Sequence, residues 1–289
     1  MTYRGRTLSY GELWDQIQAL SGAYRSLGVQ AGDRIICQLP TSPEHLIAAC
    51  AAWACGAIHV GAHKDLTGTE LAALAGRVDA RAIVFAPPAG ARDALAGLRT
   101  VRAARPQTIA IVHGHPAHDG EHALSELLGG AIAAWSAPPQ PRALAEARAD
   151  ADLLLLTSGT TGQPKAVVET LPALWAKMEF FAGAVAPGPD DVHLMYLPVC
   201  HAFGLKLSLM ALASGGRLVL LDQFSPAQAL QLVADEHVTI LPATPTHLTL
   251  LLGELDSRRP SRCEPALDRV RGGPAVAGRG RGRLRASRG

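Results

Sequence analysis

The sequence predicts an α/β fold in which parallel sheets are joined by crossover helices. Short apolar runs typical of buried strands alternate along the chain with segments whose apolar residues recur at helical spacing. This alternation is typical of parallel sheets, because consecutive parallel strands need a crossover connection, which is usually a helix. With 289 residues, of which 48% are hydrophobic and 18% charged, the chain is long and apolar enough to bury a sizeable core.

The first half of the chain shows this alternation clearly. In the segment 8–29, apolar residues recur at helical spacing, and Ser9 with Glu12 three places later predicts a capping box at the start of a helix. The next expected elements are a turn and strand at 31–40, a helix at 43–56, a strand at 57–61, a helix at 68–78, a strand at 80–85 and a strand at 108–114. The rest of residues 86–150 is less regular and rich in proline and glycine, so we expect loops there.

The alternation resumes at Ala151. The expected strands are 152–157, 166–170, 192–198, 216–221 and 238–243, and the expected helices are 171–185, 203–215, 225–237 and 245–255. Thr244 is the expected N-cap of the last helix, with Pro245 at its first position. After about Arg259 no apolar periodicity remains. We therefore expect a first α/β subdomain at 1–145, a second at 146–260, and a disordered Arg/Gly-rich tail at 261–289.

Composition excludes several classes of function. A net charge of only +2 argues against a dedicated nucleic-acid binder. The N-terminal residues lack the apolar core of a signal peptide, and no apolar run approaches the roughly 20 residues of a membrane span. The five cysteines form no CxxC pair, which favours free thiols in a reducing compartment. We expect a cytoplasmic protein without a membrane span.

The most informative stretch is TSGTTGQPK, residues 157–165, which follows four leucines at the end of an expected strand. Glycines let a backbone approach a ligand closely, hydroxyl groups donate hydrogen bonds, and a lysine supplies a point charge suited to phosphate oxygens. A loop at the carboxyl end of a strand is also where open α/β sheets bind ligands. The candidate phosphate-binding residues are Thr157, Ser158, Gly159, Thr160, Thr161, Gly162 and Lys165.

Two other interpretations of this stretch are less favoured. A P-loop of an NTPase requires G-x-x-x-x-G-K-[ST], but here Pro164 stands at the second glycine and Ala166 follows the lysine. A P-loop also leads into a helix, whereas the run after Lys165 predicts a strand. A merely flexible hairpin loop would not need so many polar and glycine positions together with a lysine.

The stretch TSGTTGQPK resembles the phosphate-binding signature of the adenylate-forming superfamily, which includes acyl- and aryl-CoA synthetases, luciferases and peptide-synthetase adenylation domains. Further stretches resemble the same family, among them LSYGEL, the strand–helix–strand from Gly56, YLPVCHAFGL with its P-x-x-H-x-x-G pattern, and the segment 215–252. The resemblance covers residues 2–257. It departs at Ala166, where the family often has glycine, and at Gly61-Ala62-His63, where a proline is common.

The resemblance implies an ATP-dependent acid–CoA ligase acting in two steps. A carboxylate attacks the α-phosphate of ATP and releases pyrophosphate; the thiol of coenzyme A then displaces AMP. The resemblance makes Lys165, Thr161 and His201 the candidate catalytic residues, with Mg²⁺ sharing the neutralisation of the phosphates and His201 forming a wall or gate beside the acid. His201 could instead be a capping or solvated residue. Amino-acid-activating relatives usually place an aspartate near His201, and none occurs at 195–206, so a fatty or aryl acid is expected.

Two weaker patterns occur elsewhere in the chain. Four histidines cluster in a loop-rich region at 113–122, where solvated side chains are favoured over a metal site, so we assign no metal-binding residue. The stripe Leu207, Met210, Leu212 predicts core packing, with a substrate tunnel as the alternative.

The resemblance also implies parts that the sequence does not show. Relatives continue with an adenine loop, a Tyr-Gly-x-Thr-Glu segment, a ribose-binding aspartate and a lid domain bearing a catalytic lysine. We therefore expect a truncated large N-terminal domain without its lid, with weak or no turnover, and a tail that is a frameshifted translation or a natural Arg/Gly-rich, RNA-binding segment. The alternative functions are a non-catalytic nucleotide-binding remnant and an adenylation domain that loads a carrier protein; the oligomeric state is not predicted.

Overall fold

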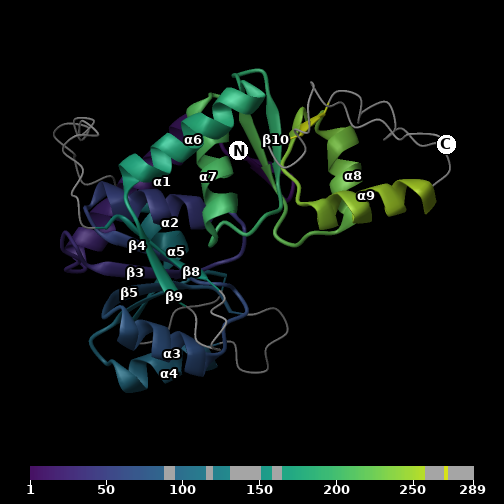
Figure 1. Ribbon diagram of the computed structural model, residues 1–289. Coiled ribbons are helices and arrows are strands. Elements are labelled where there is room, and N and C mark those ends of the chain that lie inside the picture. The colour runs from purple at the N-terminus through teal and green to yellow at the C-terminus, as the bar shows by residue number, and fades with distance from the viewer. Residues whose placement is uncertain (88–94, 115–119, 131–150, 158–164, 258–269, 273–289) are drawn as a thin grey trace. The chain divides into compact units, whose positions relative to one another are not determined.

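Two mostly parallel sheets form the core of the protein in the computed structural model (Figure 1). The structure describes residues 1–87, 95–114, 120–130, 151–157, 165–257 and 270–272. Contacts divide the chain into unit 1 (Met1–Leu8, Trp175–Pro198 and Phe203–Gly289) and unit 2 (Ser9–Leu174 and Val199–Ala202). The predicted α/β class is confirmed. The subdomain boundary predicted at 145/146 lies outside the described residues and stays a prediction.

Unit 2 is built on a seven-stranded sheet with the order β7-β6-β5-β3-β4-β8-β9, in which only the β8–β9 pair is antiparallel. Its strands are β3 (Arg34–Gln38), β4 (Ile58–Gly61), β5 (Ala80–Phe85), β6 (Ile109–Val112), β7 (Glu121–Ala123), β8 (Leu153–Thr157) and β9 (Lys165–Glu169). Its helices are α1 (Tyr10–Ser26), α2 (Pro43–Ala54), α3 (Gly68–Arg77), α4 (Ala96–Ala104) and α5 (Leu124–Gly129). Helices α1 and α2 cover one face of the sheet and α3 and α4 the other (Figure 1).

Local signals in the sequence explain where these helices begin. The predicted capping box at α1 is confirmed, because the Ser9 hydroxyl accepts from the Glu12 N–H while the Glu12 carboxylate accepts from the Ser9 N–H. Thr67 and Glu70 repeat this arrangement at α3. These hydrogen bonds lower the pKa of both glutamates, since they favour the charged carboxylate. The starts of α1 and α3 are thus encoded locally.

The region expected to be mostly loops contains further elements. Helices α4 and α5 and strand β7 lie within residues 95–130, where the sequence predicted only the strand now seen as β6. Helix α4 exposes most of its surface and buries Leu98 and Val101 against the sheet core. Two buried positions are too few to give a clear periodicity in the sequence, which explains why this helix was missed.

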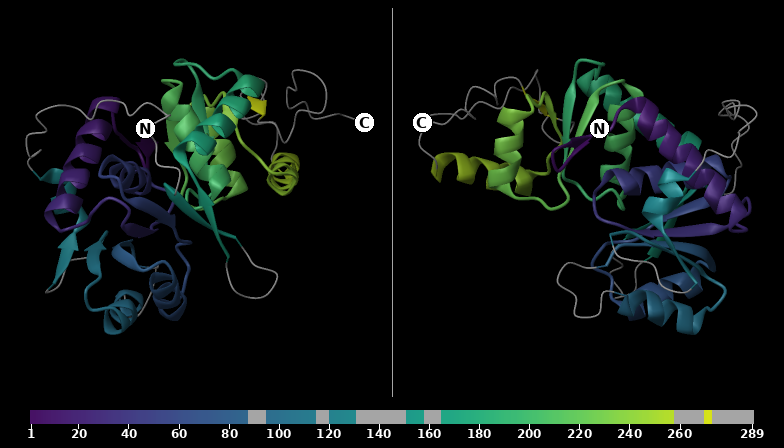
Figure 2. Two further views of the ribbon diagram at one scale, coloured as in Figure 1. Left: turned by 60° about the vertical axis from the view of Figure 1, so that its left-hand side comes forward. Right: turned by 180° about the vertical axis from the view of Figure 1, so that it is seen from behind.

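Unit 1 contains a six-stranded sheet with the order β13-β12-β10-β11-β1-β2, in which only β1–β2 is antiparallel (Figure 2). Its strands are β1 (Thr2–Tyr3), β2 (Arg6–Thr7), β10 (Val192–Met195), β11 (Arg217–Leu220), β12 (Ile240–Leu241) and β13 (Arg271–Gly272). The helices are α6 (Leu171–Val185), which starts within unit 2, α7 (Ala202–Ala213), α8 (Pro226–Asp235) and α9 (Pro245–Ser257). Strand β13 lies in the segment 261–289, where no element was expected; most of that segment is outside the described residues.

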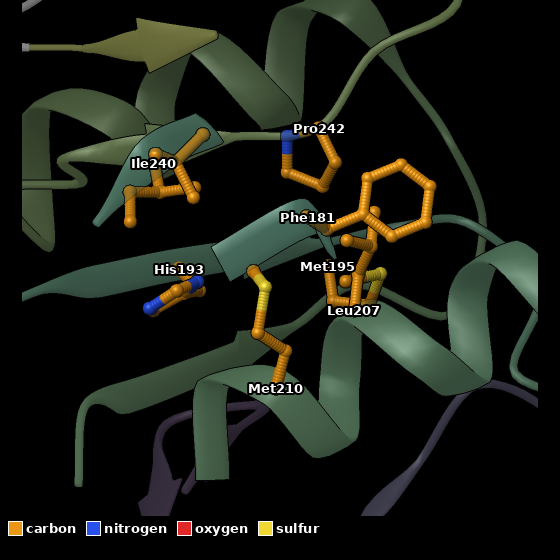
Figure 3. Close-up of a pocket in the computed structure, with 8 residues that line it drawn as sticks. Phe181, His193, Met195, Leu207, Met210, Ile240 and Pro242 are labelled. Carbon is orange, nitrogen blue, oxygen red and sulfur yellow. The ribbon is translucent and has the colours of Figure 1, made fainter. Parts of the chain in front are cut away.

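An apolar pocket lies between helices α6 and α7 and the strands β10 and β12 of unit 1 (Figure 3). Leu207 and Met210 of α7 line it together with Met195, and Met210 points from its helix toward β10. The free space between these side chains has room for about one water molecule. The predicted packing role of Leu207 and Met210 is therefore confirmed, while Leu212, which is half-buried, does not line the pocket.

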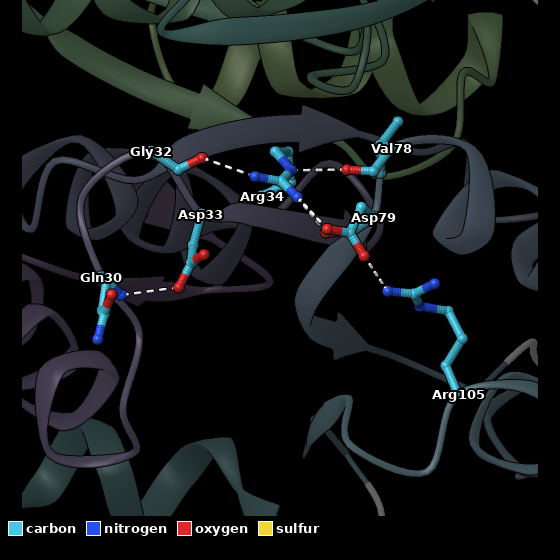
Figure 4. Close-up of polar contacts among 7 residues, drawn as sticks. All are labelled: Gln30, Gly32, Asp33, Arg34, Val78, Asp79 and Arg105. Atoms are coloured by element: carbon cyan, nitrogen blue, oxygen red, sulfur yellow. Dashed lines mark hydrogen bonds and ion pairs between the residues drawn. The ribbon is translucent and has the colours of Figure 1, made fainter.

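A cluster of charged residues holds the start of β3 to the end of α3 in unit 2 (Figure 4). The Arg34 guanidinium donates to the carbonyl oxygens of Gly32 at 3.0 Å, Val78 at 2.6 Å and Asp79 at 2.7 Å. The Asp79 carboxylate accepts from Arg34 at 2.8 Å and also from Arg105, which follows α4. Asp79 has a φ of +48°, a backbone conformation that aspartate and asparagine tolerate better than most residues. The carboxylate thus joins β3 to the end of α4.

Replacing Asp79 by asparagine should lower the free energy of unfolding by about 1 kcal/mol, because both arginines lose a charged partner while asparagine keeps the backbone conformation. The cost stays small because the Asp79 side chain is 72% exposed. Urea denaturation measures the change, and Asp15→Asn, at an exposed position of α1, is the charge-matched control. Added salt should reduce the difference between the two variants. Equal stability of both variants at low salt would contradict this role of Asp79.

Candidate active site

The two ends of the predicted phosphate-binding stretch lie on the antiparallel strands β8 and β9, at the edge of the seven-stranded sheet. Strand β8 pairs in parallel with β4 and antiparallel with β9, and Thr157 and Lys165 are register partners at the end of the pair nearest the loop that connects the two strands. Of the candidate phosphate-binding residues, these two alone lie within the described part of the chain. The remaining five, Ser158, Gly159, Thr160, Thr161 and Gly162, lie outside it. The strand predicted after Lys165 is confirmed, and it differs from the helix that a P-loop requires.

Asp152 anchors the base of the β8–β9 hairpin. Its carbonyl oxygen accepts from the His59 N–H of β4 at 3.1 Å and from the Trp53 indole N–H at 2.8 Å. Its N–H donates to the Glu169 carbonyl oxygen of β9 at 3.0 Å, and its carboxylate accepts from the Leu171 N–H at the start of α6 at 2.8 Å. One residue therefore joins both hairpin strands to α2, β4 and α6. Sequence reasoning missed it, because these partners are remote in the chain.

Three parallel strands of unit 2 end at the same edge of the sheet, and each leads into a segment of the candidate site. Strand β3 leads to Thr41, β4 leads to His63, and β8 leads to the loop that starts after Thr157. In open α/β sheets this carboxyl edge is the usual place for a ligand. The topology thus puts the entry to the predicted phosphate loop beside the ends of β3 and β4.

His201, the third candidate catalytic residue, reaches the same edge from a distant part of the chain. The Val199 N–H donates to the Thr41 hydroxyl at 3.4 Å, which ties the segment Val199–Ala202 to Thr41, three residues after the end of β3. The exposed His201 ring stacks on the ring of His63, with the two centroids 5.9 Å apart. Partial burial of the ring and, second, the nearby His63 lower the pKa of His201 below its ordinary value, which favours the neutral ring.

The two flanking residues of the P-x-x-H-x-x-G pattern, Pro198 and Gly204, pack against each other in unit 1. A Cβ at Gly204 would lie 2.3 Å from the Pro198 carbonyl oxygen and 2.8 Å from that of Leu197. No side chain fits at that distance, so glycine at this position is a packing requirement. The pattern therefore combines a structural pair with one exposed histidine between them.

Metal-binding residues do not gather in the described part of the chain. No group of three or more His, Cys, Asp or Glu side chains there is arranged to hold a metal ion. The histidine cluster predicted at 113–122 is only partly described, since His115 and His118 lie outside those residues. The cysteines Cys37, Cys50, Cys55 and Cys200 are free thiols, as expected, and Cys263 lies outside the described residues.

Comparison with known proteins decides the family. A family model described as AMP-binding enzyme matches residues 1–278. The chain belongs to the AMP-binding enzyme family. The match includes the first part of the segment 261–289, beyond the region in which the sequence alone showed a resemblance.

Two curated relatives of this chain are named as CoA ligases. The chain is 31% identical over 251 residues to the 3-[(3aS,4S,7aS)-7a-methyl-1,5-dioxo-octahydro-1H-inden-4-yl]propanoyl:CoA ligase of Mycobacterium tuberculosis, covering 86% of this chain and 48% of that protein. It is 29% identical over 260 residues to a 2-hydroxy-7-methoxy-5-methyl-1-naphthoate–CoA ligase of Streptomyces carzinostaticus, covering 87% and 46%. The crystal structure of ATP-bound MatB from Rhodopseudomonas palustris superposes with a TM-score of 0.71 at 25% identity, covering 86% and 47%.

The chain spans about half the length of the curated relatives it matches. The shared fold is that of the N-terminal region of adenylate-forming enzymes, as the resemblance implied. Within the described residues, no helix is both long enough and apolar enough to cross a bilayer.

Proposed function

We propose that this chain provides the phosphate-binding part of an ATP-dependent acid–CoA ligase that activates a fatty or aryl carboxylic acid. The observation that supports the proposal most strongly is the β8–β9 hairpin, which closes the family's signature loop between Thr157 and Lys165 at the carboxyl edge of the sheet. Membership of the AMP-binding family and the CoA-ligase names of the relatives support the same function.

The proposed reaction has two balanced steps. A carboxylate oxygen of the acid attacks the α-phosphorus of ATP, and the bond to pyrophosphate breaks. The sulfur of coenzyme A then attacks the acyl carbon and AMP leaves with the electron pair of the broken bond. Most of the catalysis in the first step is positioning and charge neutralisation, because the protein contributes no covalent intermediate.

Each candidate residue has a role in the first step. The backbone and hydroxyl groups of the loop, including Thr161, donate hydrogen bonds to the leaving pyrophosphate, and Lys165 neutralises its charge. His201, whose lowered pKa favours the neutral ring, forms a wall beside the acid. Mg²⁺ would bind the phosphate oxygens, but the described residues bring together no three side chains to hold it, so no protein ligand is assigned to it.

The test is ATP–pyrophosphate exchange with a panel of fatty and aryl acids. We expect weak exchange that depends on the acid, and Lys165→Ala should lower it by about 100-fold, the usual cost of removing one charge-stabilising contact. Lys177→Ala, an exposed lysine on α6, is the matched control and should retain the exchange rate. Binding of ATP without exchange would favour the nucleotide-binding remnant, and no binding of ATP would contradict both functions.

A further inference from the structure

Two imidazole rings from distant parts of the chain stack at the carboxyl edge of the unit 2 sheet. The ring centroids of His63, which follows β4, and His201 lie 5.9 Å apart with an angle of 28° between the ring planes. An offset stack at this separation is a favourable arrangement for planar side chains. His63 was noted in the sequence only as part of a departure from the family pattern, and no role was predicted for it.

The backbones on both sides of the stack are held by contacts of their own. A Cβ at Gly61, two residues before His63, would lie 2.5 Å from the carbonyl oxygen of Cys200, the residue before His201. Glycine at this position therefore permits the close approach of the two segments. The hydrogen bond from the Val199 N–H to the Thr41 hydroxyl holds the second segment on its other side. The fold thus fixes where the two rings meet.

The charged groups around the pair lie mainly on the His63 side. In the neutral His63 ring, Nδ1 accepts from the Asp65 N–H at 3.4 Å, so the ring proton resides on Nε2. The Asp65 carboxylate lies 3.6 Å from the same Nδ1 and 2.8 Å from the Lys64 ammonium. On the His201 side the titratable neighbour is the buried thiol of Cys200.

We propose that His63 is a positioning residue that holds the ring of His201 in one orientation at the carboxyl edge of the sheet. This inference rests on the proposed function, because His201 is placed there beside the carboxylic acid. The stack on His63 restricts the rotation of the His201 ring. Two imidazolium ions at this distance would repel each other, and this repulsion is the second cause of the lowered pKa of His201, after burial.

The first experiment needs no substrate. NMR follows the ring protons of His201 as the pH is varied in the unaltered chain and in the variants His63→Ala and His63→Phe. In the alanine variant, the pKa of His201 should rise toward its ordinary value and the ring-current shifts from the stack should disappear. In the phenylalanine variant the ring-current shifts should persist, because a planar ring remains, while the pKa still rises because the second charge is gone. His122→Ala, on β7 at the far edge of the same sheet, is the control.

The second experiment is ATP–pyrophosphate exchange on the same variants. His63→Ala should raise the KM for the acid by about 10-fold with little change in the KM for ATP, and His63→Phe should restore most of the affinity. Unchanged His201 titration and ring-proton shifts in His63→Ala would overturn the pairing. An altered titration with an unchanged KM for the acid would overturn the positioning role. Failure of the unaltered chain to exchange counts against the proposed function, while the NMR result still decides whether the pair exists.

Discussion

Lowering the pH from 7 to 5 should raise the equilibrium constant for unfolding by roughly 100-fold or more, because two histidines buried in unit 2 must stay neutral in the folded state. His45 of α2 and His59 of β4 are completely buried, and their ring centroids lie 5.7 Å apart. Among the described residues, no hydrogen-bond partner lies within reach of Nε2 of His45 or of either ring nitrogen of His59. A proton on His59 would therefore be buried without a hydrogen-bond acceptor.

The direction of the effect follows from the depressed pKa values. Burial lowers the pKa of His45 to about 4, although its Nδ1 contacts the carbonyl oxygens of Leu39 and Pro40. Burial and, second, the nearby His45 lower the pKa of His59 well below its ordinary value. In the unfolded chain both groups titrate near their ordinary value of about 6.5. The stability contributed by the neutral rings is thus fully present above pH 6.5 and is lost as the pH falls toward 4, since the unfolded state then binds more protons.

Urea denaturation at pH values between 7.5 and 4.5, followed by tryptophan fluorescence, measures this dependence. Between pH 6.5 and 5 the logarithm of the unfolding constant should change by up to about two per pH unit, one for each histidine. His59→Leu, which replaces the ring by an apolar side chain of similar size, should halve this slope, and the double variant with His45→Leu should remove most of it. His113→Leu is a control at a half-buried position of the same unit. A double variant that retains the full slope would show that these two histidines do not cause the pH dependence. Titrating carboxylates would then account for the pH dependence.

Much of the fold could be predicted from the sequence because its signals are local. The capping box of Ser9 and Glu12 involves residues three apart, and the strand after Lys165 is visible as a short apolar run. By contrast, β1 and β2 contain two residues each and exist only because β1 pairs with β11, more than 200 residues away. At the end of the expected strand 238–243, Pro242 has no N–H to donate, and the observed strand stops at Leu241.

The candidate site likewise has one part that the sequence predicts and one part that depends on contacts between distant residues. The loop residues and Lys165 form one continuous stretch whose composition indicates phosphate binding, and this stretch could be recognised without a structure. The contacts of Asp152 with the Trp53 indole and of Thr41 with Val199 join residues 99 and 158 positions apart. His63 and His201, whose rings stack, are also far apart in the chain, and no sequence pattern near either histidine predicts the stack. These contacts depend on strand order, which the sequence pattern does not specify.

Gly204→Ala should be among the most destabilising single-methyl changes in unit 1, with an expected loss of about 2–4 kcal/mol in the free energy of unfolding. The added Cβ would meet the Pro198 carbonyl oxygen at 2.3 Å and its carbon at 2.7 Å, and both are backbone atoms that cannot rotate away. Alanine favours a helix over glycine by roughly 1 kcal/mol, but this gain in α7 is smaller than the cost of displacing the backbone.

Gly183→Ala is a matched control in the same unit. Gly183 lies within helix α6, and nothing lies within 4 Å of the Cβ that alanine would add. The same substitution should therefore stabilise the protein by roughly 0.5–1 kcal/mol there, through helix propensity alone. Thermal or urea denaturation of the two variants should give shifts of opposite sign, and shifts of the same sign would show that the Pro198–Gly204 contact is not tight. If the signs differ, the glycine and proline of the P-x-x-H-x-x-G pattern act as a packing pair, which leaves His201 as its chemical residue.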